Sequence, residues 1–556
     1  MIGEDLGAVS LDAPANGSSQ ARTSLPGSKS SARHHMSSAR KPGDLGGASL
    51  PMVGGRQSRE GNTSRDPQAF EKSDARMVPR KSPNAWVTPA EGMEGRGAAE
   101  GKLAQGNTSR SQSRSNVLTR LERVGQRASE KKEKFTNLLC HLKVPLLAEA
   151  YQRLRKNAAS GVDGETWNSY GVDLDARLLD LESRIHRGSY HPWPVRRVHI
   201  PKGDGRTRPL GIPALEDKIV QQAVRMILEP IYEREFLGFS YGFRPGRSQH
   251  DALDALAMAL QRRVDWVLDA DIRSFFDTID HEWMKRFVEH RIGDKRLVRL
   301  LMKWLHAGVM EGGKLHVVEE GTPQGGIISP LLANIYLHYV LDLWVQQWRK
   351  RCARGDVYFV RYADDFVMGF ERESEAKAVR EALAKRLTEF GLELHPEKTR
   401  VLRFGRFARR NCAKDGRRRP ETFVFLGFTH ICAEGPDGGF RLIRRTSRKK
   451  RVAKLGALRE EMRRRRHAPV IDQHRWLVQV LRGHANYYGV PGNSSALASF
   501  RFQVRDFWHR QLQRRSQRAR WTAEKKKRFE NRFPLPQLGI CHPQAHRRFL
   551  AKRQPP

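Results

Sequence analysis

The chain has 556 residues, enough for three or four domains. It carries 101 lysine and arginine residues against 61 aspartate and glutamate residues, and the formal net charge of +40 points to a polyanion held through its phosphates. There is neither a run of about eighteen apolar residues nor a positively charged leader with an apolar stretch, so we expect a soluble, cytoplasmic protein without a membrane partner. Five cysteines without a Cys-x-x-Cys pair argue against a disulfide scaffold and a zinc ribbon.

Residues 1–115 are rich in glycine, serine, arginine and proline, and they nearly lack apolar periodicity. This composition predicts a disordered, basic leader that cannot build a packed core. The pentapeptide Gly-Asn-Thr-Ser-Arg occurs there twice, at 61–65 and 106–110, and we interpret it as low-complexity sequence and not as a solenoid repeat. From Val117 to Leu154 apolar residues recur at helical spacing, so the folded protein is expected to begin at this change.

Residues 195–213 predict a β-hairpin whose Gly203-Asp204-Gly205 tip is flanked by cations, including Lys202 and Arg208. An ordinary basic surface hairpin would show the same pattern. The stretch 216–236 predicts an amphipathic helix that belongs to the core. The aromatic and arginine-rich loop 239–248 either stacks on unpaired bases or packs against the protein, and the sequence does not choose between the two.

Two strand predictions end in acidic residues. Residues 266–272 form an apolar strand that ends at Asp271, and a helix capped by Asp280 follows it. Residues 360–368 predict two strands that meet at a turn formed by Asp364 and Asp365. If the first strand pairs beside this hairpin, Asp271 faces Asp364 and three repelling carboxylates require a cation. Three oxygen ligands of this kind can hold two divalent ions for phosphoryl transfer, as in a polymerase palm.

A glycine-rich loop at 321–330 overlaps the start of a long apolar helix at 327–348. A helix at 374–390 follows the acidic hairpin and leads to strands at 391–399 and 423–428.

The remaining elements predict a helical C-terminal region. Residues 441–466 carry thirteen lysines and arginines against two glutamates. A solvated face and a nuclear-localisation signal are possible interpretations, but Val452, Leu455, Leu458 and Met462 at helical spacing favour a basic amphipathic helix along a duplex. Arginines and aromatics interleave again in 500–532, which suits RNA.

The motifs at 206–213, 271–277, 322–330, 362–365, 397–399 and 425–428 stand in the order of a reverse-transcriptase domain. The stretch 481–488 resembles the maturase domain of bacterial group II intron-encoded proteins. This resemblance implies an α+β fold: a right-hand polymerase with an N-terminal extension and fingers at 116–262, a palm at 263–440 and a helical thumb/maturase domain at 441–532. The short basic tail at 533–556 is expected to hold no endonuclease domain, since it lacks paired cysteines.

The resemblance also implies site residues. Asp271, Asp364 and Asp365 are the expected catalytic carboxylates, and with Ile272 they are the expected ligands of two Mg²⁺ ions. Nucleotide contacts are assigned to Lys202, Arg208, Phe276 and Gln324. The Phe276 ring is expected where a ribose 2′-hydroxyl would lie, so that it selects deoxynucleotides, while Phe275 takes the core position.

The expected function is an RNA-directed DNA polymerase that copies intron RNA into DNA and assists splicing and mobility of that RNA. Its partners would be group II intron RNA, primer DNA, target DNA and dNTPs, and the sequence does not indicate the oligomeric state. The expected RNA-binding residues are Arg448, Lys449, Lys450, Arg451, Arg463, Arg464, Arg465, Arg466, Arg482, Asn486 and Tyr487. Two rivals are a splicing maturase with weak or no polymerase activity and an RNA-dependent RNA polymerase.

Overall fold

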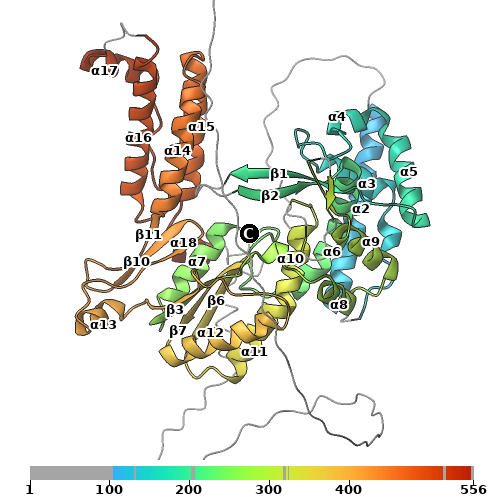
Figure 1. The fold of residues 1–556 in the computed structure, drawn as a ribbon, viewed down its shortest axis with the longest axis horizontal. Helices are drawn as coiled ribbons and strands as arrows, with labels where there is room; N and C mark the ends of the chain where they lie inside the picture. The colour runs from blue at the N-terminus through green and yellow to red at the C-terminus, as the bar shows by residue number, and fades with distance from the viewer. Residues whose placement is uncertain are drawn as a thin grey trace, which may run out of the picture. The chain divides into compact units, whose positions relative to one another are not determined.

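The computed structural model describes residues 104–130, 133–201, 207–312, 314–316, 321–322, 325–516 and 521–551. Residues 1–103 of the expected disordered leader therefore lie outside the described residues. Helix α2 (Ala104–Glu130) begins before the expected boundary at 115. Contacts divide the chain after Ser64, and every described element belongs to the second unit, Arg65–Pro556. Helices and three sheets make up this unit, which is a mixed α and β fold (Figure 1).

Helix α6 (Leu215–Glu235) is the centre of the N-terminal helical region, as its amphipathic pattern predicts. Its apolar residues are almost fully buried, and α2 and α3 (Val144–Gln152) pack against it. The other helical segments here are η1 (Leu139–His141), α4 (Trp167–Tyr170), η2 (Gly171–Asp173), α5 (Leu174–Arg187), α8 (His281–Arg291) and α9 (Lys295–Leu305). Asp280 caps α8 as expected, because its carboxylate accepts a hydrogen bond from the Trp283 amide at 2.7 Å.

The first sheet joins the predicted basic hairpin to a second hairpin. Strands β1 (Val195–Pro201) and β2 (Thr207–Ile212) are antiparallel, and β1 also pairs in parallel with β4 (Val309–Glu311), which is followed by β5 (Lys314–His316). The strand order is β2-β1-β4-β5. The tip of the first hairpin, including Lys202, lies outside the described residues.

The central sheet is antiparallel, with the order β6-β7-β3-β8. Its strands are β3 (Trp266–Asp271), β6 (Val357–Tyr362), β7 (Asp365–Phe370) and β8 (Arg400–Arg403). Alternate residues of each strand enter two different cores: one contains α12 (Glu373–Thr388), and the other contains α7 (Gln249–Leu260). The sheet is thus covered by helices on both faces, and acids stand at the end of β3 and at the start of β7.

Two expectations about strands need correction. Residues 391–399 form no strand; only Leu394 bridges to Ile272, because Pro396 lacks an amide donor and the chain turns there. The fourth strand of the sheet is β8 instead. Residues 423–428 do not extend the central sheet either. Leu426 and Gly427 have positive φ, and they separate β9 (Phe423–Phe425) from β10 (Phe428–Glu434) in a third sheet with β11 (Phe440–Thr446).

The long helix expected at 327–348 is divided into three segments. Helix α10 (Ser329–Leu337) passes into a π-helical turn, η4 (His338–Asp342), which continues as α11 (Leu343–Arg351). A π turn adds a residue to the helix and rotates the faces that follow it. No helix in the described part of the chain is both long and apolar enough to cross a lipid bilayer.

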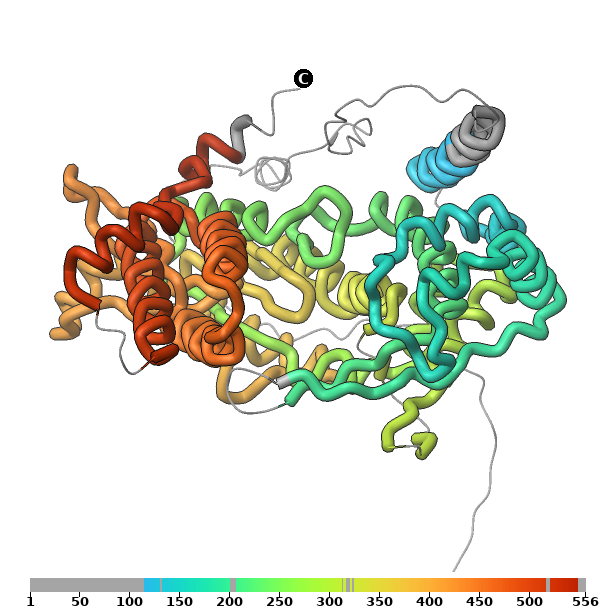
Figure 2. The backbone as a smooth tube through the Cα atoms, turned by 90° about the horizontal axis from the view of Figure 1, so that it is seen from above, coloured from blue at the N-terminus to red at the C-terminus, as the bar shows by residue number. Residues whose placement is uncertain are grey.

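The C-terminal helices α14 (Arg448–Arg464), α15 (Val470–Tyr488) and α16 (Ser494–Gln513) lie side by side (Figures 1 and 2). Leu455, Leu458 and Met462 of α14 are buried in their shared core, whereas Val452 is exposed, contrary to the expected apolar face. Helix α17 (Ala523–Arg532) follows, and α18 (Ala545–Ala551) packs on α7. The five cysteines are all free.

Candidate active site

The three predicted carboxylates lie where β3 and β6 end and β7 begins. Asp271 is the direct cross-strand partner of Asp365, so these two side chains share one face of the sheet. Asp364 lies in the turn between β6 and β7, next to Ala363, whose φ is +57°. The expectation that Asp271 faces Asp364 is therefore wrong in register: Asp271 opposes Asp365, and Asp364 lies beyond the paired residues.

Burial and mutual repulsion make these carboxylates hard to ionise together. Burial, followed by the charge of Asp271, raises the pKa of Asp365 well above its ordinary value, and Asp269 and Asp364 add to the effect. Burial is also the main cause of the raised pKa of Asp364. Asp269 lies two residues before Asp271 on β3. Burial raises the pKa of Asp269 to about 6, although the Arg400 guanidinium lies 3.6 Å from its carboxylate. A positive charge is needed for the full set to be anionic.

Two side chains supply positive charge to the carboxylates. Lys398, in the turn after the Leu394 bridge, forms an ion pair with Asp271. Exposed Arg208 of β2 acts on Asp364, whose pKa it lowers against the larger effect of burial. The predicted nucleotide ligand Arg208 is therefore close enough to the carboxylates to influence their charge.

The oxygen atoms of Asp271, Asp364 and Asp365 suit a hard cation, although they are not arranged as a complete metal site. Among the described residues, no three His, Cys, Asp or Glu side chains already converge as a metal centre requires. Lys398 pairs with one Asp271 oxygen, Oδ2, and would compete there with a metal ion. Carboxylates are nonetheless the oxygen ligands that Mg²⁺ takes, and a bound cation would offset the raised pKa values of Asp364 and Asp365. Ile272 has a buried apolar side chain, so only its backbone carbonyl could join them.

Phe276 lies beside this site with little exposed surface. It belongs to the short helix η3 (Phe275–Asp277), and its ring meets that of Phe275 edge-on with centroids 5.3 Å apart. Both rings are in the core, with Phe276 8% exposed and Phe275 2%. The Phe276 carbonyl accepts a hydrogen bond from the Thr322 amide at 2.7 Å, which connects η3 to the glycine-rich loop.

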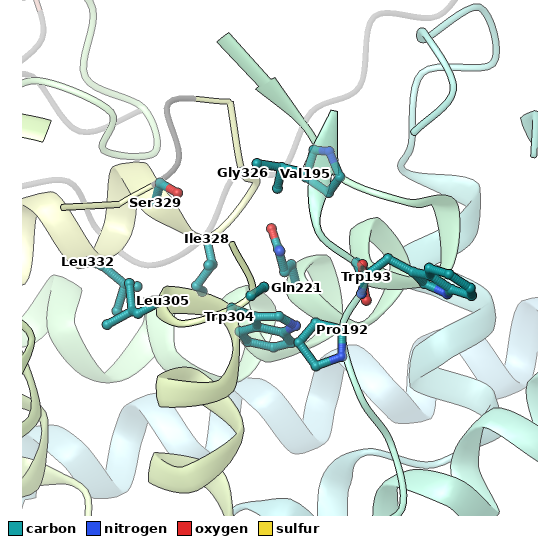
Figure 3. Close-up of a pocket in the computed structure, with 13 residues that line it drawn as sticks. Pro192, Trp193, Val195, Gln221, Trp304, Leu305, Gly326, Ile328, Ser329 and Leu332 are labelled. Carbon is teal, nitrogen blue, oxygen red and sulfur yellow. Dashed lines mark hydrogen bonds between the residues drawn. The ribbon is translucent and has the colours of Figure 1, made fainter. Parts of the chain in front are cut away.

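The glycine-rich loop packs against protein. A Cβ on Gly325 would lie 2.3 Å from the Gly211 carbonyl oxygen of β2, so this glycine is required by a backbone contact within the chain. The Ile327 amide donates to the Gln221 side-chain oxygen at 2.9 Å. Figure 3 shows Gln221 pointing towards Gly326, above a pocket floored by Trp304. Gln324, the expected nucleotide contact of this loop, lies outside the described residues.

The aromatic loop at 239–248 also has a packing role. Tyr241 is buried, and the Arg244 guanidinium is held by the Glu233 carboxylate at 2.9 Å and by backbone carbonyls. Of the two interpretations of this loop, packing is the one that the contacts support.

The expected RNA-binding residues fall into two groups. Several are exposed on α14 and α15, namely Arg448, Lys449, Lys450, Arg463, Arg464, Arg482 and Asn486, and Arg451 is half-buried. The rest take part in structural contacts. Arg465 lies over the Trp476 ring, Arg466 donates to the Gln511 side chain at 3.1 Å, and Tyr487 donates its hydroxyl proton to the Leu426 carbonyl at 2.8 Å.

Two features were missed by reasoning from the sequence. Arg361 is fully buried beneath the acidic turn, although its position before Tyr362 gave only a strand signal. The second feature is a basic segment around α13 (Ala408–Lys414), where exposed arginines continue to Arg419. Its charge density was readable in the sequence, but nothing there showed that it projects from the central and third sheets.

The sheet order and the acidic strand ends define the class: this is a polymerase domain of the reverse-transcriptase type. Residues 200–430 match the family described as reverse transcriptase (RNA-dependent DNA polymerase). The chain is 37% identical to Protein YkfC of Escherichia coli (strain K12) over 314 residues, which cover 51% of this chain and 78% of that protein. It is 39% identical to group II intron-encoded protein LtrA of Lactococcus lactis subsp. cremoris over 237 residues.

The protein belongs to the family of group II intron-encoded reverse transcriptases and maturases. The match to LtrA covers 42% of this chain and 39% of LtrA. A further relative is nuclear intron maturase 3, mitochondrial, of Arabidopsis thaliana, which is 28% identical over 182 residues, 29% of this chain and 25% of that protein.

Proposed function

We propose that this protein is an RNA-directed DNA polymerase that copies intron RNA into DNA, with β1–β2 as fingers, the central sheet as palm and α14–α16 as thumb and maturase region. The observation that carries the proposal is the group of three carboxylates at adjacent strand ends, with Arg208 and Lys398 facing them. Such a group has no use in packing, because it costs electrostatic free energy unless a cation or a charged substrate neutralises it.

In this proposal Asp271, Asp364 and Asp365 hold two Mg²⁺ ions, with the Ile272 carbonyl as a further ligand. When bound, the ions supply charge neutralisation for in-line attack by the primer 3′-hydroxyl on the α-phosphate and for the departing pyrophosphate. Arg208, and Lys202 on the same hairpin, attract the triphosphate. Lys398 exchanges Asp271 for a solvent or phosphate partner as the carboxylate takes up its ligand role.

Selection of the sugar is assigned to Phe276, whose ring edge would exclude a ribose 2′-hydroxyl. Because the ring is largely buried, Phe276→Ala would remove core packing worth about 3–5 kcal/mol. Phe276→Leu is the better test, since it shortens the side chain with a smaller cavity. Greater ribonucleotide incorporation relative to dNTPs is expected, and unchanged discrimination would leave Phe276 with a core role only. Gln324 is assigned to the nascent base pair.

We also propose that the basic surface of α14 and α15 binds group II intron RNA and assists its splicing, and that primer DNA and target DNA are further partners. Support comes from the exposed cations of these helices and from relatives named as intron-encoded or as maturase. The relatives named maturase keep a second function open: an RNA-binding splicing factor with little polymerase activity.

One experiment separates these functions. Asp364→Asn removes a carboxylate charge at nearly constant volume, so primer extension on a primed RNA template should fall at least about a hundredfold, while RNA affinity stays within about twofold. Incorporation is measured with dNTPs and with NTPs, and RNA affinity by filter binding. Wild-type protein that binds intron RNA but extends no primer would support the splicing factor, and a preference for NTPs would support an RNA polymerase.

The RNA surface needs a variant that leaves packing intact. Arg463 and Arg464 are exposed, and among the described residues they pair with neighbouring glutamates of α14. Arg465 and Arg466 also contact other helices, through the Trp476 ring and the Gln511 side chain. Arg463→Gln with Arg464→Gln should weaken intron binding and splicing more than synthesis on a generic template. Asp271→Asn should have the opposite effect. Equal losses in both assays for either variant would contradict this division.

A further inference from the structure

Arg361 is fully buried, and all of its hydrogen-bonding capacity is used beneath the acidic turn. Its side chain and that of Asp342 are both 0% exposed and form a two-pronged ion pair. A guanidinium has five N–H donors. They reach the two Asp342 carboxylate oxygens at 2.7 and 2.6 Å, the Ser240 hydroxyl at 2.7 Å, the Asn334 side-chain oxygen at 3.2 Å and the Ala363 carbonyl at 3.0 Å.

The π-helical turn η4 makes this arrangement possible. Asn334 lies in α10 and Asp342 ends η4, eight residues later. In a regular α-helix, residues eight apart point about 80° away from each other, since each residue turns the helix by about 100°. The extra residue of the π turn offsets this rotation, and both side chains reach Arg361. Asn334 also donates to the Gly242 carbonyl at 2.7 Å.

The Ala363 carbonyl is the link from this network to the carboxylates. Ala363 has a left-handed backbone, which costs a non-glycine residue free energy and persists only where neighbours hold it. Its carbonyl and the Asp364 amide belong to one rigid peptide plane. That plane ends at the Asp364 Cα, from which the carboxylate extends. The contact between Arg361 and the Ala363 carbonyl therefore orients the peptide plane that carries Asp364.

Residues 239–242, which precede α7, also contact the acidic turn. The Arg361 amide donates to the Phe239 carbonyl at 3.0 Å, and the Tyr241 amide donates to the Arg361 carbonyl at 2.9 Å. A Cβ on Gly242 would lie 2.2 Å from the Ala363 nitrogen, so only glycine allows this approach. The turn is thus fixed by contacts from β6, α10, η4 and the 239–242 segment.

We propose that Arg361, Asn334 and Asp342 are positioning residues that set the affinity of the acidic turn for its divalent cation, by holding the Ala363–Asp364 peptide in the metal-binding orientation. The proposal rests on the metal-binding role assigned to Asp364. It differs from a purely stabilising role, because a buried ion pair can be replaced by apolar residues of similar volume with little loss of stability, whereas the tether to Ala363 would be lost.

The test uses the double variant Arg361→Met with Asp342→Leu in the full chain. Terbium luminescence measures cation binding without nucleic acid, and a Mg²⁺ titration of primer extension gives the midpoint separately from the maximal rate. Loss of a contact that orients a ligand commonly costs about ten- to hundredfold in metal affinity, so both midpoints should rise at least about tenfold. Excess Mg²⁺ should restore much of the rate, and RNA affinity should stay unchanged.

Two further variants keep the outcome decisive. Arg361→Lys retains the charge beside Asp342 but cannot supply five donors, so it should show the same shift in cation midpoint even if the double variant fails to fold. Arg291→Met with Glu235→Leu replaces the pair that buried Arg291 of α8 forms with half-buried Glu235 of α6, and should leave the cation midpoint unchanged. Wild-type terbium and Mg²⁺ midpoints in folded Arg361→Lys would overturn the proposal. Because terbium binding needs no turnover, absence of polymerase activity in the wild type would not affect this test.

Discussion

In the proposed metal site, Lys398 would compete with metal ions for Asp271. The ammonium is paired with this carboxylate, but its side chain is 56% exposed, so the pair is screened by water and contributes modestly. Lys398→Gln should therefore tighten terbium binding to the nucleic-acid-free protein by about two- to fivefold, as expected for loss of a competing surface ion pair. Arg273→Gln is the matched control, because Arg273 is about as exposed as Lys398 and forms an ion pair with Glu393. Weaker terbium binding by Lys398→Gln alone would show that Lys398 supports the site.

The positions of the three carboxylates at strand ends could be predicted from the sequence, because strand alternation and a two-residue turn place acids locally. Asp271 and the Asp364-Asp365 turn needed no more than this pattern. The pairing of Asp271 with Asp365 depends on strand register, which the apolar residues of β3 and β7 fit in more than one way. The role of Arg361 could not be predicted, because its partners are brought by a π turn and by a segment about 120 residues earlier.

At the scale of elements, Asp217 connects α6 to the chain before β1. Its carboxylate accepts hydrogen bonds from the Tyr190 hydroxyl and, at 3.0 Å, from the Trp193 amide, and the Trp304 indole donates to Tyr190 at 3.1 Å. Trp193 and Trp304 line the pocket of Figure 3 with Asp217. Burial raises the pKa of Asp217 from 3.8 to about 7, against the effect of its hydrogen bonds.

This pKa predicts how stability changes with pH. Between about pH 4 and 7 the folded protein keeps a proton on Asp217 that the unfolded chain has lost, so the free energy of unfolding falls as pH rises through this window. Asp217→Asn cannot ionise and should lack this contribution. Relative to the wild type, its free energy of unfolding should rise by roughly 2 kcal/mol between pH 5 and pH 8, measured by urea unfolding. Parallel pH profiles of the two proteins would contradict the prediction.

The C-terminal segment is bound to the rest of the protein through α18. Arg548 forms an ion pair with buried Asp254 of α7 and donates to the His250 carbonyl at 2.9 Å, while Arg444 of β11 reaches the same Asp254 at 2.9 Å. The expectation of a short basic tail for 533–556 did not include this contact. No local pattern predicts this contact, because the partners of Arg548 lie nearly 300 residues earlier.

Arg548→Ala should release α18 while Arg444 still neutralises Asp254. A lost hydrogen bond to a charged group costs about 1.5–3 kcal/mol, enough to expose the segment to limited proteolysis and to faster amide exchange. Arg547→Ala is the control, since the neighbouring Arg547 is exposed. Equal protection of α18 in both variants would show that apolar contacts alone hold it.

At the scale of the whole molecule, a net charge of +40 raises the question of where nucleic acid lies on the surface. Composition predicts the polyanion partner but not the path, because salt-dependent binding counts only those cations that reach phosphates. The structure offers two sets of exposed cations on the polymerase domain. Arg410, Arg418 and Arg419 belong to the α13 segment, and Arg372, Arg380 and Lys385 belong to α12 under the central sheet (Figure 1). Within the described residues, neither set is within ion-pair distance of a carboxylate.

The two sets provide variants of equal charge at different places. Replacing Arg410, Arg418 and Arg419 by Gln lowers the net charge by three, as does the same change at Arg372, Arg380 and Lys385. We expect the α13 segment to contact RNA phosphates, because exposed Phe407 lies among its arginines and aromatic side chains stack on unpaired bases. Each phosphate contact contributes about one unit to the slope of log affinity against log salt, so the α13 variant should lose about two to three units and the α12 variant less than one. Equal slopes for the two variants would mean that net charge, and not the α13 segment, governs RNA affinity.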